Sequence, residues 1–496
     1  MTHPTTTRTF GLSKSKITMF EQCPKRLWLA THRKDLAEYD EGAEARFAAG
    51  HEIGAIACAL ISDGIMVEAE PDLRAAVDRT RELLALQQPR TIFEATLEHD
   101  GVLVRIDILE PNKGGGWNLI EVKSSGSAKD YHHNDLATQL WVARQCGLTI
   151  RSASIRHVDT RFVLEEPGNY RGLFRDTELL HAVGDIVAKR EEQVGGARAA
   201  LGGPQPEKEC GDHCSSPFVC EFTAYCRSSL PPGPEWTVDV LNNGGGKKWR
   251  ARGIEDLFDI DSSMLGSPTH QRIYHATVNN EPYHDPDGAR GAMNDWDFPR
   301  AWLDFETIAF AAPRWVGTRP YQQVPFQYSV HVEQRDGTID HREFLSLNGA
   351  DPRRACAEAL VSDVPATGAV IAYNASFERS QVKALADVFP DLAPALLSVA
   401  DRLVDLLPVT RAHYYHRDQR GSWSIKAVLP TVSDLDYATL EIKDGGSAQQ
   451  AYLSAMCADC SDEEREMLAE ELKAYCGRDT WAMIVLARRL TGSAQS

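Results

Sequence analysis

The sequence predicts a mixed α/β (α+β) fold made of two domains that follow one another along the chain. Residues 91–123 carry strand patterns around an Asp-Gly pair at 100–101, which is typical of a β-hairpin. Residues 302–373 carry strand and helix signals in the order βββαβ. A Pro-Pro-Gly-Pro run at 231–234 suits neither helix nor strand and separates the two halves.

The composition is that of ordinary globular domains and excludes several classes of protein. The 496 residues are 43% hydrophobic, which is enough for more than one core. No run approaches the ~20 apolar residues of a membrane span. The first residues also lack an apolar signal-peptide core, so we expect a cytoplasmic protein without a membrane partner. The net charge of −18 disfavours a histone-like binder, because a polyanion then needs a local basic groove or metal ions.

Two polar segments suggest the domain boundaries. The first follows residue 230, and the second precedes a new apolar strand near residue 293. We therefore expect a first domain at 1–230, a small helical connector at 231–292 and a second domain at 293–496.

The first domain carries a group of two carboxylates and one ammonium. Residues 102–109 and 117–123 are predicted strands. Glu121 and Lys123 are two positions apart, so they project from the same face, and Asp107 can lie beside them on the neighbouring strand. Such a group can hold a divalent metal that generates hydroxide, while the lysine positions the attacking water.

Helices are predicted on both sides of these strands. Residues 43–60 carry His51, residues 130–146 carry Gln139, and a further strand follows near residues 153–158. A lone helical histidine is more often structural than a ligand, so the order of the elements matters more than His51 alone.

In this order the region resembles the PD-(D/E)XK nucleases of the RecB and Cas4 type. The resemblance implies that His51, Asp107 and Glu121 bind a metal ion, that Lys123 is catalytic and that Gln139 supports the site.

The cysteines are unevenly distributed. Of eleven cysteines, Cys210, Cys214, Cys220 and Cys226 crowd into one short segment, which is typical of a metal or cluster site in a reducing compartment. Zinc and a [4Fe–4S] cluster both accept four thiolates. One early cysteine and three late ones resemble the iron–sulfur staple of the Cas4 and AddB nucleases. This implies a [4Fe–4S] cluster on Cys23, Cys214, Cys220 and Cys226, with Cys210 as an extra thiol.

The second domain carries acidic residues on three separate elements. Asp304 and Glu306 lie on one face of a predicted strand. Glu378 follows the strand predicted at 369–373, where a helix begins. A long helix predicted at about 462–489 places Tyr475 and Asp479 on one face.

These four carboxylates are suited to two metal ions about 4 Å apart, the spacing used in phosphodiester hydrolysis. Tyr475 would orient the water. Asp405 is an alternative acid from a neighbouring segment.

This half of the chain resembles the DEDD 3′–5′ exonucleases of the RNase H-like fold, in their tyrosine subtype. Ser424-Ile425-Lys426 opens a stretch similar to the one before their last motif. Glu378 stands where that family has aspartate, which displaces the carboxyl group by about one methylene. The whole chain resembles the DUF2779 proteins, a group with a RecB-like front and an RNase H-like back.

Together these features predict a metal-dependent nuclease that uses Mg²⁺ or Mn²⁺. We expect it to act on DNA with single-stranded or free ends, and DNA is inferred from the Cas4-like half alone. Two alternatives remain open: a nucleic-acid-binding or assembly protein with one degenerate centre, and an RNA exonuclease.

Overall fold

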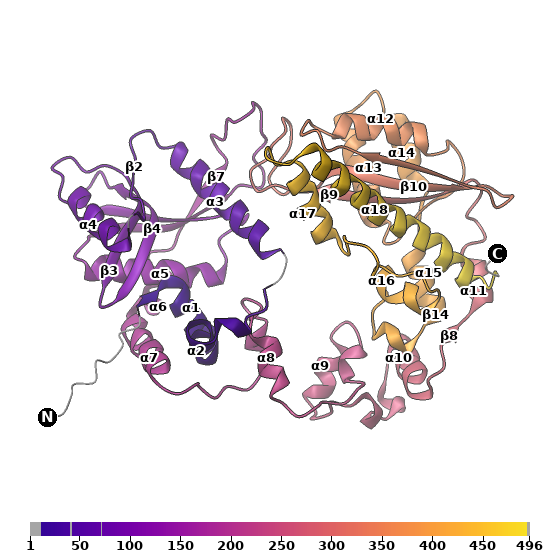
Figure 1. The fold of residues 1–496 in the computed structure, drawn as a ribbon, viewed down its shortest axis with the longest axis horizontal. Helices are drawn as coiled ribbons and strands as arrows, with labels where there is room; N and C mark the ends of the chain where they lie inside the picture. Colours follow the sequence, from indigo (N-terminus) through magenta and orange to yellow (C-terminus); the bar gives the residue numbers. More distant parts are fainter. Residues whose placement is uncertain (1–10, 40–41, 71, 494–496) are drawn as a thin grey trace. The chain divides into compact units, whose positions relative to one another are not determined.

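The computed structural model describes residues 11–39, 42–70 and 72–493. The chain forms two compact units (Figure 1). The first comprises Met1–Pro231 and Phe310–Gln322, and the second comprises Pro232–Ala309 and Gln323–Ser496.

The strands and α-helices of the first unit are β1 (Leu12–Ser13), α1 (Lys14–Gln22), α2 (Pro24–His32), α3 (Ala43–Ala59), β2 (Ile65–Met66), α4 (Leu73–Leu84), β3 (Ile92–His99), β4 (Val102–Pro111), β5 (Trp117–Lys123), α5 (Asp130–Gln145), β6 (Ile150–Val158), β7 (Phe174–Glu178), α6 (Gly184–Ala188), α7 (Arg190–Gly202) and α8 (Thr223–Ser228).

The sheet of the first unit is mixed and has the strand order β2-β3-β4-β5-β6-β7, with β1 added beside β4. Strands β3, β4 and β5 are antiparallel neighbours, whereas β6 lies parallel to β5. The hairpin between β3 and β4 turns at Asp100 and Gly101, whose φ angles are 47° and 67°. These positive values are the ones that a two-residue hairpin turn requires, so the predicted turn is confirmed.

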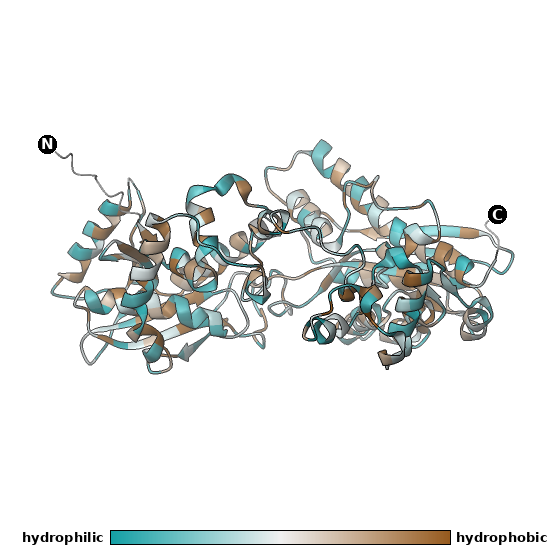
Figure 2. Cartoon of the chain, turned by 90° about the horizontal axis from the view of Figure 1, so that it is seen from below, coloured by the Kyte–Doolittle hydropathy of each residue, from teal (hydrophilic) through white to brown (hydrophobic). Residues whose placement is uncertain are grey.

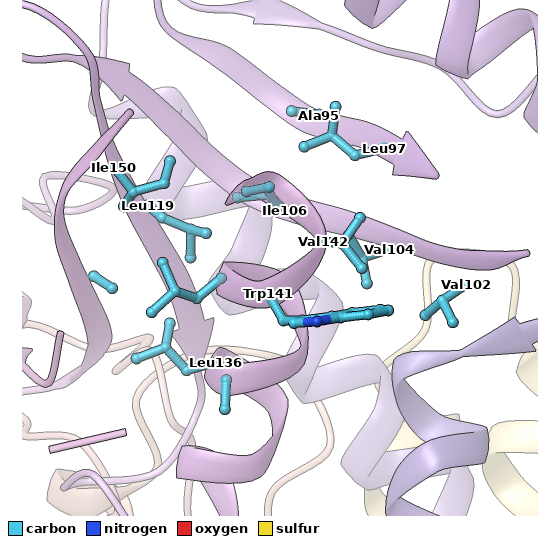
Figure 3. Packing of buried hydrophobic residues seen from close by; sticks show 14 of the residues in the cluster. Ala95, Leu97, Val102, Val104, Ile106, Leu119, Leu136, Trp141, Val142 and Ile150 are labelled. Carbon is cyan, nitrogen blue, oxygen red and sulfur yellow. The ribbon is translucent and has the colours of Figure 1, made fainter. Parts of the chain in front are cut away.

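Helix α5 covers one face of this sheet and forms the centre of the core. Leu136, Trp141 and Val142 of α5 pack against buried side chains of β3, β4 and β5 (Figure 3). Val104 and Ile106 of β4 are almost fully buried in this cluster. Burial of such side chains contributes roughly 25 cal/mol per Å² of apolar surface, so it fixes α5 and the sheet as one body.

A buried ion pair attaches α1 to the same body. Arg190 of α7 is fully buried and donates from Nη1 to Glu21 Oε1 of α1 at 2.5 Å. Its Nη2 donates to the Asn134 carbonyl of α5 at 3.0 Å. One guanidinium therefore joins three helices, and a buried charge of this kind is costly to leave unpaired.

The strands and α-helices of the second unit are α9 (Gly245–Arg250), α10 (Pro268–Asn279), β8 (Tyr283–His284), α11 (Pro286–Ala292), β9 (Arg300–Ile308), β10 (Val324–Glu333), β11 (Ile339–Leu345), α12 (Arg353–Asp363), β12 (Val370–Ala372), α13 (Ser376–Val388), α14 (Ala393–Asp401), β13 (Leu403–Asp405), α15 (Leu406–His413), β14 (Tyr414–Tyr415), α16 (Ile425–Val428), α17 (Gly445–Ala455) and α18 (Asp462–Leu490).

The main sheet of the second unit has the order β11-β10-β9-β12-β13. Strands β11, β10 and β9 are antiparallel, and β12 and β13 continue the sheet in parallel. Leu303 and Phe305 of β9 face the cluster formed with α12, α13 and α14. Trp302 packs in the opposite cluster with residues of α18. Alternation along β9 therefore sends Asp304 and Glu306 to the α18 side of the sheet.

The predicted elements that carry candidate residues are present with small changes in their ends. The strand predicted at 117–123 and the helix predicted at 462–489 are observed as β5 and α18. Brown and teal bands alternate along the helices of both units, in keeping with one apolar and one polar face (Figure 2). Among the described residues, no helix has the length and apolarity that crossing a membrane would demand.

Candidate functional site

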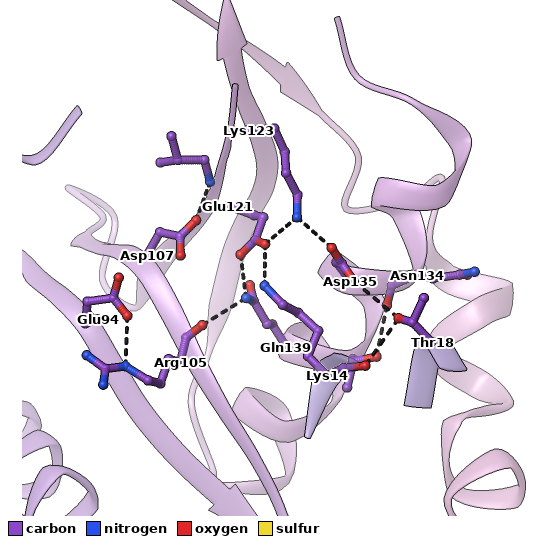
Figure 4. Close-up of polar contacts among 12 residues, drawn as sticks. Lys14, Thr18, Glu94, Arg105, Asp107, Glu121, Lys123, Asn134, Asp135 and Gln139 are labelled. Atoms are coloured by element: carbon purple, nitrogen blue, oxygen red, sulfur yellow. Dashed lines mark hydrogen bonds and ion pairs between the residues drawn. The ribbon is translucent and has the colours of Figure 1, made fainter. Parts of the chain in front are cut away.

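The front centre, which we define as Asp107, Glu121, Lys123 and Gln139, forms on β4, β5 and α5 (Figure 4). Glu121 is 1% exposed. Its Oε1 atom accepts from Lys123 Nζ at 2.8 Å, and its Oε2 atom accepts from Gln139 Nε2 at 2.5 Å. The ammonium of Lys14 also donates to Oε1. Three donors therefore surround one buried carboxylate.

The remaining front residues are tied to neighbouring elements. Asp107 Oδ2 accepts from the backbone N–H of Val122 at 2.6 Å. Lys123 also donates to Asp135 Oδ2 of α5 at 2.6 Å. These contacts place the predicted carboxylates and the lysine in one group, as the strand spacing indicated.

Burial and charge move the pKa values of the two acids in opposite directions. Burial raises the pKa of Asp107 well above its ordinary range, and the nearby Glu121 carboxylate adds to this rise. Burial also acts to raise the pKa of Glu121, but the ammonium groups of Lys14 and Lys123 outweigh it and hold this pKa below its ordinary value. The surroundings of the front centre therefore favour the ionised form of Glu121 and the protonated form of Asp107.

His51 lies on α3 with an exposed side chain. Within the described residues, it does not join Asp107 and Glu121 in a set whose ligand atoms all lie within 4.8 Å of one another. Its role as a metal ligand stays a prediction.

Two charged residues beside the front centre were not among the residues predicted from the sequence. Lys14 comes from the first turn of α1, and Asp135 lies on α5 four residues before Gln139. Lys14 is far from β5 in the chain, so only the packing of α1 beside the sheet brings it to Glu121. For Asp135, the spacing of four to Gln139 on one helix was an available signal.

The cysteines lie around a small cavity in the first unit. Its lining includes Cys23, Cys210, Cys214, Cys220 and Cys226. No three of the described thiols have sulfur atoms that all lie within 4.8 Å of one another, so a compact set of thiolates around a single ion is not evident. Burial raises the pKa of Cys220 to about 11, so this group favours the protonated thiol. The donor set fits a metal or cluster by its chemistry, and the [4Fe–4S] cluster on Cys23, Cys214, Cys220 and Cys226 stays a prediction.

The back centre, which we define as Asp304, Glu306, Glu378, Tyr475 and Asp479, lines an open pocket of about 260 Å³. Asp304, Glu306 and Asp479 offer oxygen atoms that all lie within 4.8 Å of one another. Strand β9 supplies the first two and α18 supplies the third. Three oxygen ligands at this separation suit a hard cation such as Mg²⁺ or Mn²⁺.

Glu378 lies at the edge of this arrangement. It is 4% exposed in the first turn of α13 and lines the pocket, but it is not part of the set of three. Its Oε2 atom is buried without a hydrogen-bond partner.

Asp405, the alternative acid, has a structural role. Its Oδ1 atom accepts from the backbone N–H groups of Asn374 at 3.0 Å and Leu407 at 2.9 Å, so it caps α15. A carboxylate occupied by two backbone donors is less available to a metal ion.

Tyr475 and two residues outside the predicted set complete the pocket. Lys426 Nζ donates to Tyr475 Oη at 3.0 Å and to the Lys443 carbonyl at 2.6 Å. The hydroxyl of Tyr437 donates to Asp479 Oδ1. Lys426 belongs to the motif noted in the sequence, whereas Tyr437 lies in a loop and carries no comparable signal.

The acids of the back centre favour protonation when no cation is bound. Burial, reinforced by Asp479, raises the pKa of Glu306 to about 8. Burial raises the pKa of Glu378 to about 8. The pKa of Asp304 is also well above its ordinary range, because of burial and the charges of Asp479 and Glu306. Crowded buried carboxylates with raised pKa values are typical of functional sites.

Comparison with known proteins identifies part of the second unit. Residues 301–424 match the family described as Domain of unknown function (DUF2779). This range contains Asp304, Glu306 and Glu378.

Two curated relatives are similar to part of the chain. The "Uncharacterized protein MG366" of Mycoplasma genitalium is 24% identical over 207 residues, which are 37% of this chain and 31% of the relative. The "Uncharacterized protein MG366 homolog" of Mycoplasma pneumoniae is 26% identical over 210 residues, or 38% of this chain and 31% of the relative. The match thus covers less than a third of either relative, and the homology is distant. The family match itself covers residues 301–424, about a quarter of the chain.

Proposed function

We propose that the protein is a metal-dependent nuclease that hydrolyses phosphodiester bonds of DNA with single-stranded or free ends. The observation that carries this proposal is the convergence of Asp304, Glu306 and Asp479 within 4.8 Å beside an open pocket. The choice of DNA rests on the resemblance of the first half of the chain to Cas4-type nucleases.

In this proposal Asp304, Glu306 and Asp479 hold a divalent cation. When bound, the cation supplies Lewis acidity and lowers the pKa of water, so that hydroxide becomes accessible near neutral pH. Tyr475 lies at the pocket with its hydroxyl held by Lys426 at 3.0 Å, and it orients the attacking water. The Lys426 ammonium uses two of its three N–H donors on Tyr475 and Lys443, which leaves one for a phosphate oxygen.

Neighbouring residues keep the carboxylates in place. The Tyr437 hydroxyl fixes Asp479. The thiol of Cys476 lies 3.8 Å from Asp304 Oδ2 and donates a weak hydrogen bond. Both partners sit on or beside α18, so the helix and its contacts preorganise the ligand set.

The front centre is proposed as a second phosphodiesterase centre. This assignment rests on the resemblance and on the grouping of Asp107, Glu121 and Lys123, supported by the 2.8 Å contact between Lys123 and Glu121. The lysine is suited to stabilising charge on the scissile phosphate.

A [4Fe–4S] cluster remains part of the proposal, held by Cys23, Cys214, Cys220 and Cys226. The shared cavity of these thiols supports it. We expect anaerobically purified protein to be brown with absorbance near ~400 nm. If the purified protein is instead colourless and contains zinc, the four thiols hold a zinc ion and not an iron–sulfur cluster.

The nuclease proposal is tested with end-labelled single- and double-stranded DNA and RNA in the presence of Mg²⁺ or Mn²⁺. The chains compared are wild type, Asp304→Asn, Lys123→Ala and the double variant, with Glu466→Gln as a control. Glu466 is an exposed acid on α18, the helix that also carries Asp479.

We expect each centre variant to lose a different part of the product pattern, while the control cuts like wild type. Cleavage of RNA alone would favour the RNA exonuclease. Absence of cleavage by wild type on every substrate would favour the binding or assembly protein.

A further inference from the structure

Lys14 reaches the front centre from an element that no sequence motif linked to it. Its ammonium donates to Glu121 Oε1, the oxygen that also accepts from Lys123 at 2.8 Å (Figure 4). The other oxygen of Glu121 accepts from Gln139 at 2.5 Å. Glu121 is expected to bind a metal ion, yet both of its carboxylate oxygens already accept hydrogen bonds from protein donors.

The position of Lys14 is fixed by the backbone around it. Strand β1 pairs with β4 through Leu12 and Val102. Ser13 then caps α1, because its Oγ atom accepts from the Lys16 N–H at 3.3 Å. The Lys14 side chain is only 23% exposed. Lys14 is thus not a surface lysine that folds back by chance, since the strand pairing and the helix cap aim its first bonds at β5.

The body of α1 is also anchored. Ile17 is fully buried in the core of the first unit. Thr18 Oγ1 donates to Asp135 Oδ1 at 3.4 Å, and Glu21 pairs with the buried Arg190. The helix therefore holds the backbone of Lys14 beside the centre, while the flexible four-carbon stem of the lysine lets its ammonium move between neighbouring partners.

The charges around Glu121 explain what Lys14 can do. A divalent cation competes with the ammonium groups of Lys14 and Lys123 for Glu121 Oε1, because both kinds of group are attracted by its negative charge and a cation would have to displace an ammonium from it. Two ammonium groups beside one another also form a site suited to a phosphate, which carries several acceptor oxygens.

We propose that Lys14 is a second phosphate-binding lysine of the front centre and that it occupies the cation position at Glu121 until metal and substrate enter together. The inference rests on the proposed nuclease function. Glu121 and Asp107 would hold the cation, and Lys14, displaced from Glu121, would contact the phosphate together with Lys123. Without substrate, the front centre therefore binds a metal ion weakly.

The test uses full-length protein that carries Asp304→Asn and Asp479→Asn, so that the back centre does not contribute. In this background, Lys14→Met is compared with Lys16→Met. Lys16 lies on the same helix, and its ammonium donates to the Gly11 carbonyl at 2.8 Å, which makes it a matched control. Mn²⁺ affinity is measured by equilibrium binding with detection of free Mn²⁺ by electron paramagnetic resonance. Cleavage of single-stranded DNA is measured in parallel.

We expect Lys14→Met to bind Mn²⁺ about tenfold more tightly than its parent, because one of the two competing ammonium groups is gone. We expect its cleavage to fall by about tenfold or more, because the phosphate has lost a partner. Lys16→Met should leave both quantities unchanged.

Unchanged or weaker Mn²⁺ binding by Lys14→Met would overturn the proposal, and so would absence of Mn²⁺ binding in both variants. Circular dichroism checks folding, and Lys14→Gln replaces Lys14→Met if the latter unfolds. If the parent cuts no nucleic acid, the nuclease function of the front centre fails, whereas the Mn²⁺ comparison still decides whether Lys14 competes with the cation.

Discussion

The front and back centres differ in how the charge of their buried carboxylates is balanced. In the front centre, Glu121 is buried with two ammonium groups and an amide as partners, so its charge is balanced by the protein. In the back centre, Asp304, Glu306 and Asp479 face one another, and the ammonium of Lys426, which lines the same pocket, is bound to Tyr475 and Lys443. Buried carboxylates without enough cations must either take up protons or bind a metal ion.

This difference indicates how each centre depends on an external cation. In the front centre, protein donors balance the charge of Glu121 without a metal ion. The back centre is incomplete without one, because three acids share a small volume. Four predictions test this contrast.

The largest effect is expected for removal of one back-centre ligand. In a Lys123→Ala background, which removes cleavage at the front centre, Asp479→Asn should lower the cleavage rate by about a thousandfold, because the cation loses one of three converging oxygens. It should also abolish most of the rise in melting temperature that Mn²⁺ gives wild type. Initial rates and thermal melts measure the two effects. Glu466→Gln, at an exposed position of the same helix, is the control. Equal Mn²⁺ stabilisation of wild type and Asp479→Asn would contradict the assignment.

The next effect concerns the anchor that holds α1 beside the front centre. Arg190→Met should lower the free energy of unfolding by about 3–5 kcal/mol, because it leaves Glu21 unpaired in a largely buried place. Urea denaturation followed by circular dichroism measures the change. Because Lys14 lies on the same helix, cleavage at the front centre should fall as well. A loss below about 1 kcal/mol would mean that packing alone holds α1.

A smaller effect is expected in the dependence of stability on pH. The pKa of Glu306 is raised to about 8 by burial and by Asp479, so the metal-free folded state binds a proton that the unfolded chain has lost. Stability from this group is therefore present below about pH 4.5 and is lost as the pH rises towards 8. Glu121 behaves in the opposite sense, because its pKa is lowered and its contribution is lost only in acid.

Glu306→Gln should accordingly stabilise the metal-free protein at pH 8 by on the order of 2 kcal/mol relative to wild type, and much less at pH 5. Chelator-treated protein melted across this pH range provides the measurement. Metal addition should stabilise wild type more at pH 8 than at pH 6, since binding releases protons. A difference between the variant and wild type that does not change with pH would show that Glu306 is not the titrating group.

The smallest effect distinguishes two roles of Asp405, as the cap of helix α15 or as a metal ligand. Asp405→Ala should cost about 1 kcal/mol of stability, because α15 and Asn374 lose their acceptor. Asp405→Asn retains an acceptor and should cost less. Neither change should alter Mn²⁺ affinity at the back centre. A weaker affinity in Asp405→Asn at unchanged stability would assign this acid to the metal site after all.

Much of the fold could be predicted from the sequence because its signals are local. Alternation on β9 separates Leu303 and Phe305 from Asp304 and Glu306, and this pattern depends only on the period of a strand. The turn at Asp100 and Gly101 depends on residues that tolerate positive φ. The spacing of Tyr475 and Asp479 depends only on the period of a helix.

Local patterns also indicated which residues of each centre lie together. Glu121 and Lys123 share a face of β5, and Asp107 joins them because β4 is the adjacent strand. The convergence of β9 with α18 was expected from the order of elements in a resembling family, and not from any spacing, since Asp304 and Asp479 are 175 positions apart in the chain.

Tertiary structure alone decided the charge balance of the two centres. Lys14 reaches Glu121 because β1 pairs with β4, and Tyr437 reaches Asp479 because a loop folds over α18. The same packing keeps Glu378 out of the three-acid set and assigns Asp405 to a helix cap. Which side chains share a strand face or a helix face could be read from the sequence, because the periods of strands and helices are properties of the backbone. Contacts across long chain separations depend on how whole elements pack, and it is these contacts that set burial, partners and pKa values.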